Sequence, residues 1–258
     1  MGVAPTSLHP LEMHGRDAHA TGMKSTPDAI RARFDADVER FSNLETGQSA
    51  TIDAPLVLDL VTSAAKATNP DARSVLDVGC GAGNYTLKLL EKLPNLSVTL
   101  IDLSEPMLDR AVQRITAAGA RNVTPLQGDV RELSLPDESF DIILAAAVLH
   151  HLRTDDEWLA VCRTFHRGLR PGGSVWIADL VQQSTPAVQS LMWQRYGDYL
   201  EQLGGAAYRD KVFEYIDKED SPRDVMFQID TLRRAGFARI ELLHKNSVFA
   251  AFGGIKPE

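Results

Sequence analysis

The chain has 258 residues, of which 44% are hydrophobic and 24% are charged, and its formal net charge at pH 7 is −8. This length and composition predict a soluble globular chain with a sizeable core. The negative charge argues against binding nucleic acid or an anionic membrane over a broad surface, although a local basic patch is compatible with it.

Residues 1–26 are expected to form a flexible polar tail. This segment lacks the apolar core of a secretory signal peptide. The longest apolar run of the chain, residues 142–149, is too short to span a bilayer. His9, His14 and His19 lie five residues apart in the tail, and we expect them to be solvated rather than to hold a metal.

The chain contains two cysteines, Cys80 and Cys162. Two cysteines are too few for a disulfide framework, and neither has the spacing of a metal ligand. We therefore expect reduced thiols in a cytoplasmic protein, with no metal site and no membrane partner.

Helical periodicity begins at Pro27, a favourable first-turn residue. It predicts one amphipathic helix over residues 28–41 and another over residues 54–67. From Ser74 onward, short β-rich apolar runs alternate with helical segments, which predicts a parallel sheet covered on both faces. The expected strands are 74–78, 97–101, 122–126, 140–146 and 174–179, and the expected helices between them are 84–92, 105–118 and 155–168.

After Asp179 this alternation ends. Residues 187–216 are expected to be mainly helical, and a helix over residues 222–235 is expected to stop at Gly236. The last two apolar runs, 238–244 and 247–254, are joined by a connection too short for a crossover. They predict an antiparallel pair at the end of the sheet.

The stretch VLDVGCGAGNYT, residues 75–86, carries Gly79, Gly81 and Gly83 between a predicted strand and a predicted helix. A glycine-rich turn at this place lets backbone N–H groups approach a ligand. The dinucleotide fingerprint G-x-G-x-x-G would require a third glycine where this chain has Asn84. An NAD-dependent oxidoreductase is therefore nearly excluded.

Three carboxylates, Asp77, Asp102 and Asp129, stand at the ends of three successive predicted strands. Asp77 would repel a pyrophosphate but suits a cationic group. Asp102 is placed to accept both hydroxyls of a ribose, and Asp129 could accept the exocyclic amine of an adenine. Ligands of open parallel sheets bind beyond the carboxyl ends of the strands, so these acids predict a site for a cationic nucleoside.

These residues resemble those of the class I S-adenosylmethionine-dependent methyltransferases. The similarity runs in order through VLDVGCGAGNYT (75–86), VTLIDLSEPML (98–108), LQGDVRELSLPDESFDIILAAAVLHHL (126–152) and LRPGGSVWIADL (169–180). The segment from 232 to 256 resembles the family's closing helix and hairpin. The resemblance implies an α/β fold with a Rossmann-like, doubly wound, seven-stranded sheet, mostly parallel with an antiparallel last strand.

The resemblance also implies a domain organisation. Residues 27–70 would form a helical lid, and Gln48 and Thr51 in its polar connection could contact the methionine carboxylate. Residues 71–258 would form the cofactor-binding domain, with a helical insertion at about 186–222. The cofactor would be S-adenosyl-L-methionine, and a lid of this kind would keep water out of the site.

Roles for individual residues follow from the same resemblance. Asp77 would lie near the methionine amino group, and Leu103 would lie against the adenine. Ala146 stands at the tip of the fourth strand, where many relatives have a polar residue, so only its backbone could contact the cofactor. The implied cofactor-binding residues are Asp77, Gly79, Gly81, Asp102, Leu103, Asp129, Val130 and Ala146.

The implied reaction is an in-line displacement on an activated methyl group, which needs a base only if the acceptor carries a proton. His150 and Asp179 are weak candidates for a catalytic role, and no catalytic residue is assigned. The V-L-H-H-L pattern around His150 and His151 is widespread in the superfamily, which favours a structural role. Tyr196 and Tyr199 lie in the insertion at a spacing that favours helix packing over substrate binding.

Several functions remain open at this stage. The expected acceptor is an unidentified small molecule, and a tRNA base is the alternative. The layout also resembles carboxy-S-adenosylmethionine synthase, which requires an arginine on the insertion; Arg195 or Arg209 could supply it. A non-catalytic cofactor-binding or scaffolding protein is an alternative of another class. The oligomeric state is not predicted.

Overall fold

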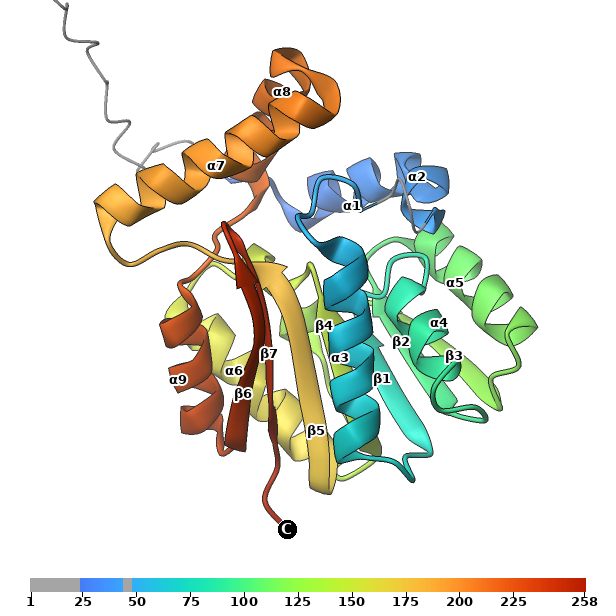
Figure 1. Ribbon diagram of the computed structural model, residues 1–258. Coiled ribbons are helices and arrows are strands. Elements are labelled where there is room, and N and C mark those ends of the chain that lie inside the picture. The colour runs from blue at the N-terminus through green and yellow to red at the C-terminus, as the bar shows by residue number, and fades with distance from the viewer. Residues whose placement is uncertain (1–23, 44–47) are drawn as a thin grey trace, which may run out of the picture.

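The computed structural model describes residues 24–43 and 48–258, so the three tail histidines lie outside the described residues. One seven-stranded sheet stands at the centre of the molecule (Figure 1). Its strands are β1 (Ser74–Val78), β2 (Ser97–Asp102), β3 (Asn122–Gln127), β4 (Phe140–Ala146), β5 (Leu169–Leu180), β6 (Ala238–Asn246) and β7 (Phe249–Ile255).

The strand order is β3-β2-β1-β4-β5-β7-β6. The first five strands pair in parallel, and β7 lies between β5 and β6 and runs antiparallel to both. The Rossmann-like sheet with an antiparallel last strand is therefore confirmed.

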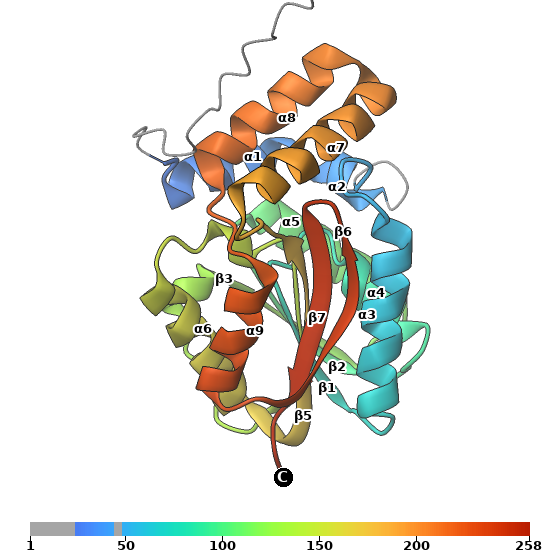
Figure 2. The ribbon, with the colours of Figure 1, turned by 60° about the vertical axis from the view of Figure 1, so that its left-hand side comes forward.

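Helices cover both faces of the sheet, as Figure 2 shows. One face carries α3 (Ala54–Thr68), α4 (Asn84–Leu90) and α5 (Glu105–Ala117), and the other carries α6 (Asp155–Gly168) and α9 (Val225–Ala235). Alternate side chains of β4 serve the two cores, since Ile142 and Leu144 pack on the α3 side and Ile143 and Ala145 on the α6 side.

The helix ends follow from local chemistry. The Ser104 hydroxyl accepts a hydrogen bond from the Met107 amide at 3.3 Å and caps α5. Thr154 and Glu157 form a reciprocal capping box at the start of α6. Gly236 ends α9 with a φ of 110°, as the sequence predicts.

Two predicted elements differ in the structure. The single helix expected over 28–41 is two helices, α1 (Pro27–Ala36) and α2 (Val38–Ser42), because Asp37 leaves the helical region with φ −115° and ψ 14°. β5 begins at Leu169 rather than at 174. The additional residues 169–173 belong to the strand, and their pairing with β4 is irregular.

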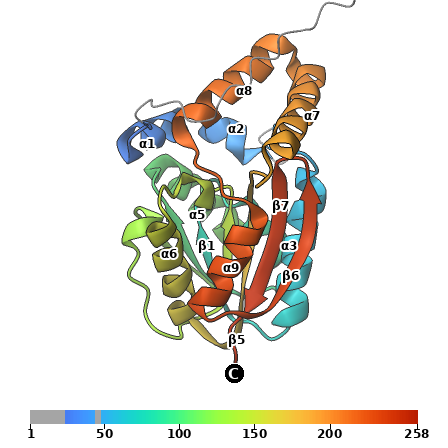
Figure 3. The ribbon, with the colours of Figure 1, turned by 90° about the vertical axis from the view of Figure 1, so that its left-hand side faces the viewer.

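A second layer lies over the carboxyl ends of the strands. It consists of α1, α2 and the hairpin of α7 (Pro186–Gly204) and α8 (Ala206–Glu219), as Figure 3 shows. α3, which the sequence analysis groups with the lid, instead packs along the sheet through residues such as Val57 and Val61. The part of the expected lid that lies over the strand ends is α1 and α2.

Both cysteines are buried and unpaired. Burial raises the pKa of the Cys162 thiol to about 12, which makes it unreactive at neutral pH. Within residues 24–43 and 48–258, no helix is long and apolar enough to cross a membrane.

Candidate active site

A cavity opens beyond the carboxyl ends of β1 to β5, beneath the layer of α1, α2 and α8. Gln48, Thr51, His150 and Asp179 line it. So do all eight predicted cofactor-binding residues: Asp77, Gly79, Gly81, Asp102, Leu103, Asp129, Val130 and Ala146. The fold therefore brings together residues that are up to about 130 positions apart in the chain, because parallel strands end at the same edge of the sheet.

The three glycines of the first loop all have positive φ, at 64°, 48° and 83° for Gly79, Gly81 and Gly83. A Cβ atom on Gly79 would lie 2.6 Å from Val148, and one on Gly83 would lie 2.8 Å from Ile115. A Cβ atom on Gly81 would have no described atom within 4 Å. Gly79 and Gly83 are thus needed for packing, whereas Gly81 keeps open space beside the backbone.

Asp77 is a buried carboxyl with an incomplete set of partners. It is 1% exposed, and the Thr86 hydroxyl donates to its Oδ2 at 2.6 Å. Burial raises the pKa of Asp77 from its ordinary value of 3.8 to about 7, and the Thr86 hydrogen bond offsets only part of this effect. A cation placed beside it would remove the cost of the buried charge.

Asp102 links the ends of the first two loops. Its Oδ2 accepts from the Gly81 amide at 2.8 Å, and its Oδ1 accepts from the Ser104 amide at 2.9 Å. Burial raises its pKa, against the effect of these amides. Each carboxylate oxygen has capacity for a further donor, so the held carboxylate can accept two hydroxyls.

Asp129 pairs with Arg131. The Arg131 guanidinium bonds both carboxylate oxygens, and the Arg131 amide donates to Oδ1 at 2.9 Å. Burial would raise the pKa of Asp129, but these bonds lower it overall. An adenine amine at Asp129 would have to share an oxygen with Arg131, a partner that the sequence reasoning missed although it lies only two residues away.

The small side chains at the end of β4 leave the cavity open at its centre. Ala146 lines the cavity, and the next residue, Ala147, has a φ of 54° and donates its amide to the Ala178 carbonyl at 2.8 Å. A non-glycine residue with positive φ is uncommon, and it turns the chain sharply away from the sheet toward His150.

His150 and Asp179, named separately from the sequence, are hydrogen-bonded to each other. Asp179 Oδ1 bonds His150 Nδ1, and the His150 amide donates to Asp179 Oδ2 at 3.1 Å. Burial alone would lower the pKa of His150, but the carboxylates of Asp179 and Asp220 raise it to about 9. Asp220, just after α8, also lies 3.2 Å from His151 Nδ1. No motif in the sequence marks Asp220.

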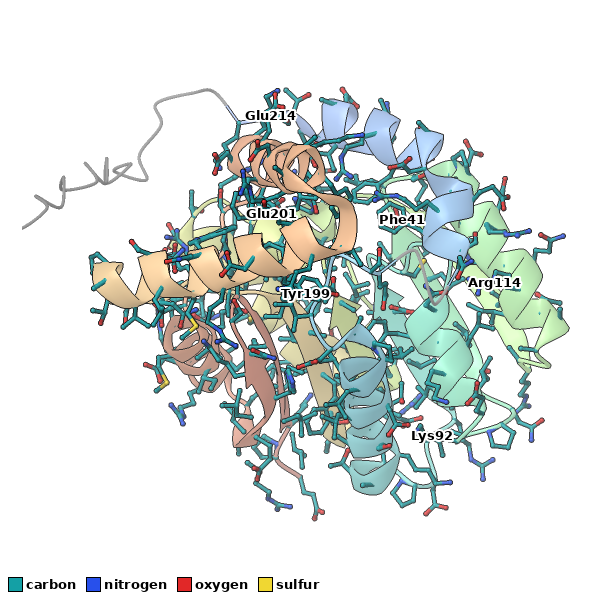
Figure 4. The ribbon with its side chains drawn as sticks, turned by 45° about the horizontal axis from the view of Figure 1, so that its top comes forward. Phe41, Lys92, Arg114, Tyr199, Glu201 and Glu214 are labelled. Atoms are coloured by element: carbon teal, nitrogen blue, oxygen red, sulfur yellow. The ribbon has the colours of Figure 1, made fainter. Side chains whose placement is uncertain are left out.

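The layer of α1, α2 and α8 over the cavity, here called its roof, is held in place by polar contacts on two sides. On one side, Asn84 Nδ2 donates to the Phe41 carbonyl in α2, and Asn84 Oδ1 accepts from Arg114 at 2.8 Å. Figure 4 labels Phe41 and Arg114 on this side of the molecule. On the other side, Arg33 of α1 makes a bidentate ion pair with the buried Glu219, with a shortest N···O distance of 2.6 Å.

The insertion does not bring its arginines to the cavity. Arg209 pairs with Glu201 and Asp210, and neither Arg195 nor Arg209 is among the lining residues. The arginine required by the carboxy-S-adenosylmethionine synthase alternative is therefore not supplied by either candidate. The hydroxyls of Tyr196 and Tyr199 donate to backbone carbonyls in the segment after α2. Tyr196 also lines the cavity, whereas Tyr199 does not.

These observations fit S-adenosylmethionine. Asp77 offers a buried carboxyl that a cation would complete, Asp102 offers a fixed double acceptor, and the space at Gly81 allows a ligand to lie against the backbone. A pyrophosphate-bearing dinucleotide would be repelled by the charge of Asp77. The chain also has Asn84 where a dinucleotide site has its third glycine.

Comparisons with known proteins agree with this assignment. Residues 75–173 match the family of methyltransferase domains. The demethylmenaquinone methyltransferase of Listeria monocytogenes is 29% identical over 188 residues, covering 71% of this chain and 78% of that enzyme. The malonyl-[acyl-carrier protein] O-methyltransferase of a Paenibacillus species is 30% identical over 157 residues, covering 59% of this chain and 55% of that enzyme.

Solved structures share the fold. Human N-acetylserotonin methyltransferase in complex with S-adenosylmethionine has a TM-score of 0.62 at 17% sequence identity. The alignment covers 95% of this chain and 66% of the human chain. The likeness extends beyond the sheet to most of the present chain.

Proposed function

Because this chain belongs to the class I S-adenosylmethionine-dependent methyltransferases, we propose that it methylates a small aromatic acceptor that carries a hydroxyl group. The observation that carries the proposal is the division of the cavity into two parts. Carboxylates and bare backbone line the part at β1 to β3, and aromatic rings with a histidine–aspartate cluster line the part toward β5 and α8.

The sheet order supports the first part as the cofactor site. Asp129, Asp102 and Asp77 follow β3, β2 and β1, which are neighbours in the sheet and about 5 Å apart. A cofactor lying across these three ends would place its adenine at Asp129, its ribose at Asp102 and its amino group at Asp77. The methyl group would then be presented near Ala146, at the end of the next strand.

The acceptor would lie beyond Ala146, against rings from the lid, the insertion and β7. The lining residues include Phe34, Tyr208, Tyr215 and Phe249. Flat rings of this kind favour a planar apolar acceptor. The hydroxyls of Tyr208 and Tyr215 have no hydrogen-bond partner among residues 24–43 and 48–258, so they remain able to bond an oxygen of the acceptor.

S-adenosylmethionine supplies a methyl group that a sulfonium already activates. The protein has to hold the acceptor oxygen in line and exclude water, and such positioning contributes on the order of 7–11 kcal/mol. Water is excluded by the helices over the cavity, α1, α2 and α8, which contribute Ile30, Phe41 and Ile216 to its lining. His150, His151 and Asp220 form a polar cluster in the lining of the cavity.

The names of the relatives support a small-molecule acceptor over a tRNA base. One relative is named for demethylmenaquinone and another for a malonyl group on a carrier protein. An aromatic acceptor agrees better with the first of these names, because the acceptor side of this cavity is lined by rings.

The test has two stages. Calorimetric titration of the full chain with S-adenosylmethionine and with NAD should show binding of the first only, and Asp102→Ala should weaken it at least tenfold. Transfer of a labelled methyl group is then measured to hydroquinones and phenols, to malonyl thioesters and to tRNA. Transfer to phenolic hydroxyls supports the proposal, and transfer only to carboxylates or tRNA contradicts it.

A matched pair of variants tests the aromatic wall. Tyr215→Phe keeps the ring and removes the hydroxyl, so it should raise the KM for the acceptor and leave cofactor affinity unchanged. Tyr199→Phe removes a hydroxyl that lies outside the cavity and bonds the Ser49 carbonyl. It should leave the KM for the acceptor unchanged.

A further inference from the structure

The acceptor side of the cavity contains three side chains of the kinds that bind metals. His150 Nε2 lies 3.6 Å from Asp220 Oδ1, and His151 Nδ1 lies 3.2 Å from the same oxygen. All three atoms lie within 4.8 Å of one another. They come from the turn after β4 and from the end of α8, which meet at the hydrogen bond from the Ser221 amide to the His150 carbonyl.

Two of these atoms are buried and make no hydrogen bond to any residue of 24–43 or 48–258. They are His151 Nδ1 and Asp220 Oδ1, which lie 3.2 Å apart but are poorly aligned for a bond to each other. Asp220 is only 3% exposed. A buried polar atom that lacks a partner costs about 1–3 kcal/mol, so this arrangement calls for a group that would satisfy both atoms.

We propose that His150, His151 and Asp220 bind a divalent transition-metal ion. Two imidazole nitrogens and one carboxylate oxygen suit Fe²⁺, Co²⁺ or Zn²⁺ better than Mg²⁺ or Ca²⁺, which prefer oxygen ligands. Ligand atoms about 2.0–2.2 Å from such an ion lie roughly 3 Å from each other. The two histidine–aspartate separations of 3.2 and 3.6 Å are close to this value, and the two nitrogens lie within 4.8 Å of each other.

Asp179 completes the arrangement. Its carboxylate bonds Nδ1 of His150, which leaves Nε2 of the same ring to face Asp220. A carboxylate behind a ligating histidine fixes the ring and strengthens it as a ligand. Both Asp179 oxygens are already bonded, one by His150 Nδ1 and the Leu180 amide and the other by the His150 amide, so Asp179 is a positioning residue and not a ligand.

Three protein ligands leave coordination positions open toward the cavity. This further role rests on the proposed function, because it assigns an open position to the acceptor hydroxyl. A metal ion lowers the pKa of an oxygen that it binds, so the acceptor would lose its proton to water more readily. The ion would also fix the direction from which the acceptor approaches.

The test is a titration of the full chain with Co²⁺, followed by calorimetry and by visible absorption, with no cofactor or acceptor present. We expect one ion per chain, bound at least tenfold more tightly than Mg²⁺. His151→Asn and Asp220→Asn should each weaken Co²⁺ binding at least tenfold, and thermal unfolding checks that both variants are folded.

Two control variants separate this site from other histidines. His244→Asn alters a histidine that is paired with Asp53 outside the cavity, and it should leave Co²⁺ binding unchanged. A variant with His9, His14 and His19 all changed to Asn should also bind Co²⁺ as the natural chain does. Absence of binding, binding that survives both cluster variants, or binding lost in the tail variant overturns the proposal. None of these results depends on the acceptor, so the proposed function is judged separately.

Discussion

The side-chain amide of Asn84 donates a hydrogen bond to the backbone carbonyl of Phe41 at 3.0 Å. Asn84 begins α4, directly after the glycine loop, and Phe41 belongs to α2 in the roof of the cavity. The position that would be glycine in a dinucleotide site therefore connects the glycine loop to the layer of helices over the cavity.

Asn84→Ala removes the hydrogen bonds to the Phe41 carbonyl and from Arg114. It should weaken S-adenosylmethionine binding at least fivefold, since loss of the bond to α2 alone costs about 1 kcal/mol. The roof would close less firmly over the bound cofactor, and hydrogen exchange in α2 should become faster. Calorimetry and exchange measurements check both expectations. Lys88→Ala, on the same helix and paired only with Glu91, is the control and should change neither. Unchanged exchange in α2 for Asn84→Ala would refute the link.

Substitutions in the glycine loop should separate packing from ligand approach. Gly81→Ala should lower stability by about 1–2 kcal/mol because of the positive φ at this position. It should also greatly weaken cofactor binding, because the added methyl group would occupy the open space beside the backbone. Gly79→Ala adds a clash with Val148, which costs about 1–3 kcal/mol more. Chemical denaturation measures the first effect and calorimetry the second. Equal cofactor affinity in Gly81→Ala and the natural chain would show that the open space at Gly81 has another use.

Cofactor affinity should depend on pH through Asp77. The carboxyl has a pKa of about 7 in the free protein, and it must lose its proton to face the cofactor's cationic amino group. Affinity should therefore fall up to tenfold per pH unit below about 7 and level off above it. Calorimetry between pH 5.5 and 7.5 measures this slope. Asp77→Asn should bind weakly with little slope, and a natural chain with the same affinity at both ends of the range would contradict the role.

Asp77 should also make the stability of the cofactor-free protein depend on pH, but in the opposite direction: stability should fall as the pH rises. The pKa of Asp77 is 3.8 in the unfolded chain and about 7 in the folded protein. The raised pKa therefore does not reduce the free energy of unfolding below pH 3.8, and the reduction grows until the pH exceeds about 7. The shift corresponds to roughly 4 kcal/mol at most. Asp77→Asn should therefore be more stable than the natural chain at pH 8 and similar to it at pH 4, as measured by urea unfolding. A lower stability of Asp77→Asn at pH 8 would contradict this.

The sequence predicted the seven-stranded sheet with its antiparallel last strand, and it predicted residues that the fold brings together at one cavity. Asp77, Asp102 and Gly81 could be found because strand ends and a glycine loop are local patterns, and parallel strands bring local patterns to one edge. Their detailed partners were also short-range, such as the Thr86 hydroxyl on Asp77, nine residues away.

The partners of His151 and Arg33 could not be predicted in the same way. Asp220 reaches His151 from a helix end almost seventy residues later, and Glu219 reaches Arg33 across 186 positions. Neither Asp220 nor Glu219 belongs to a sequence motif. The spacing of apolar residues, from which helices and strands are predicted, carries no information about contacts between distant helix ends. The sequence also did not predict the interruption of the helix at Asp37. The apolar residues keep their helical spacing across Asp37, although its backbone is not helical.

The roof of the cavity joins the beginning of the described chain to a segment near its end. Lys24 Nζ donates to the Asp217 carbonyl across 193 positions, and the Ser25 amide donates to the Lys218 carbonyl. During translation at about 5–20 residues per second, α1 would emerge roughly 10–40 seconds before its partner in α8 exists. The cofactor loop is thus synthesised and able to fold while the site is still open, and closure of the cavity is reserved for a nearly finished polypeptide.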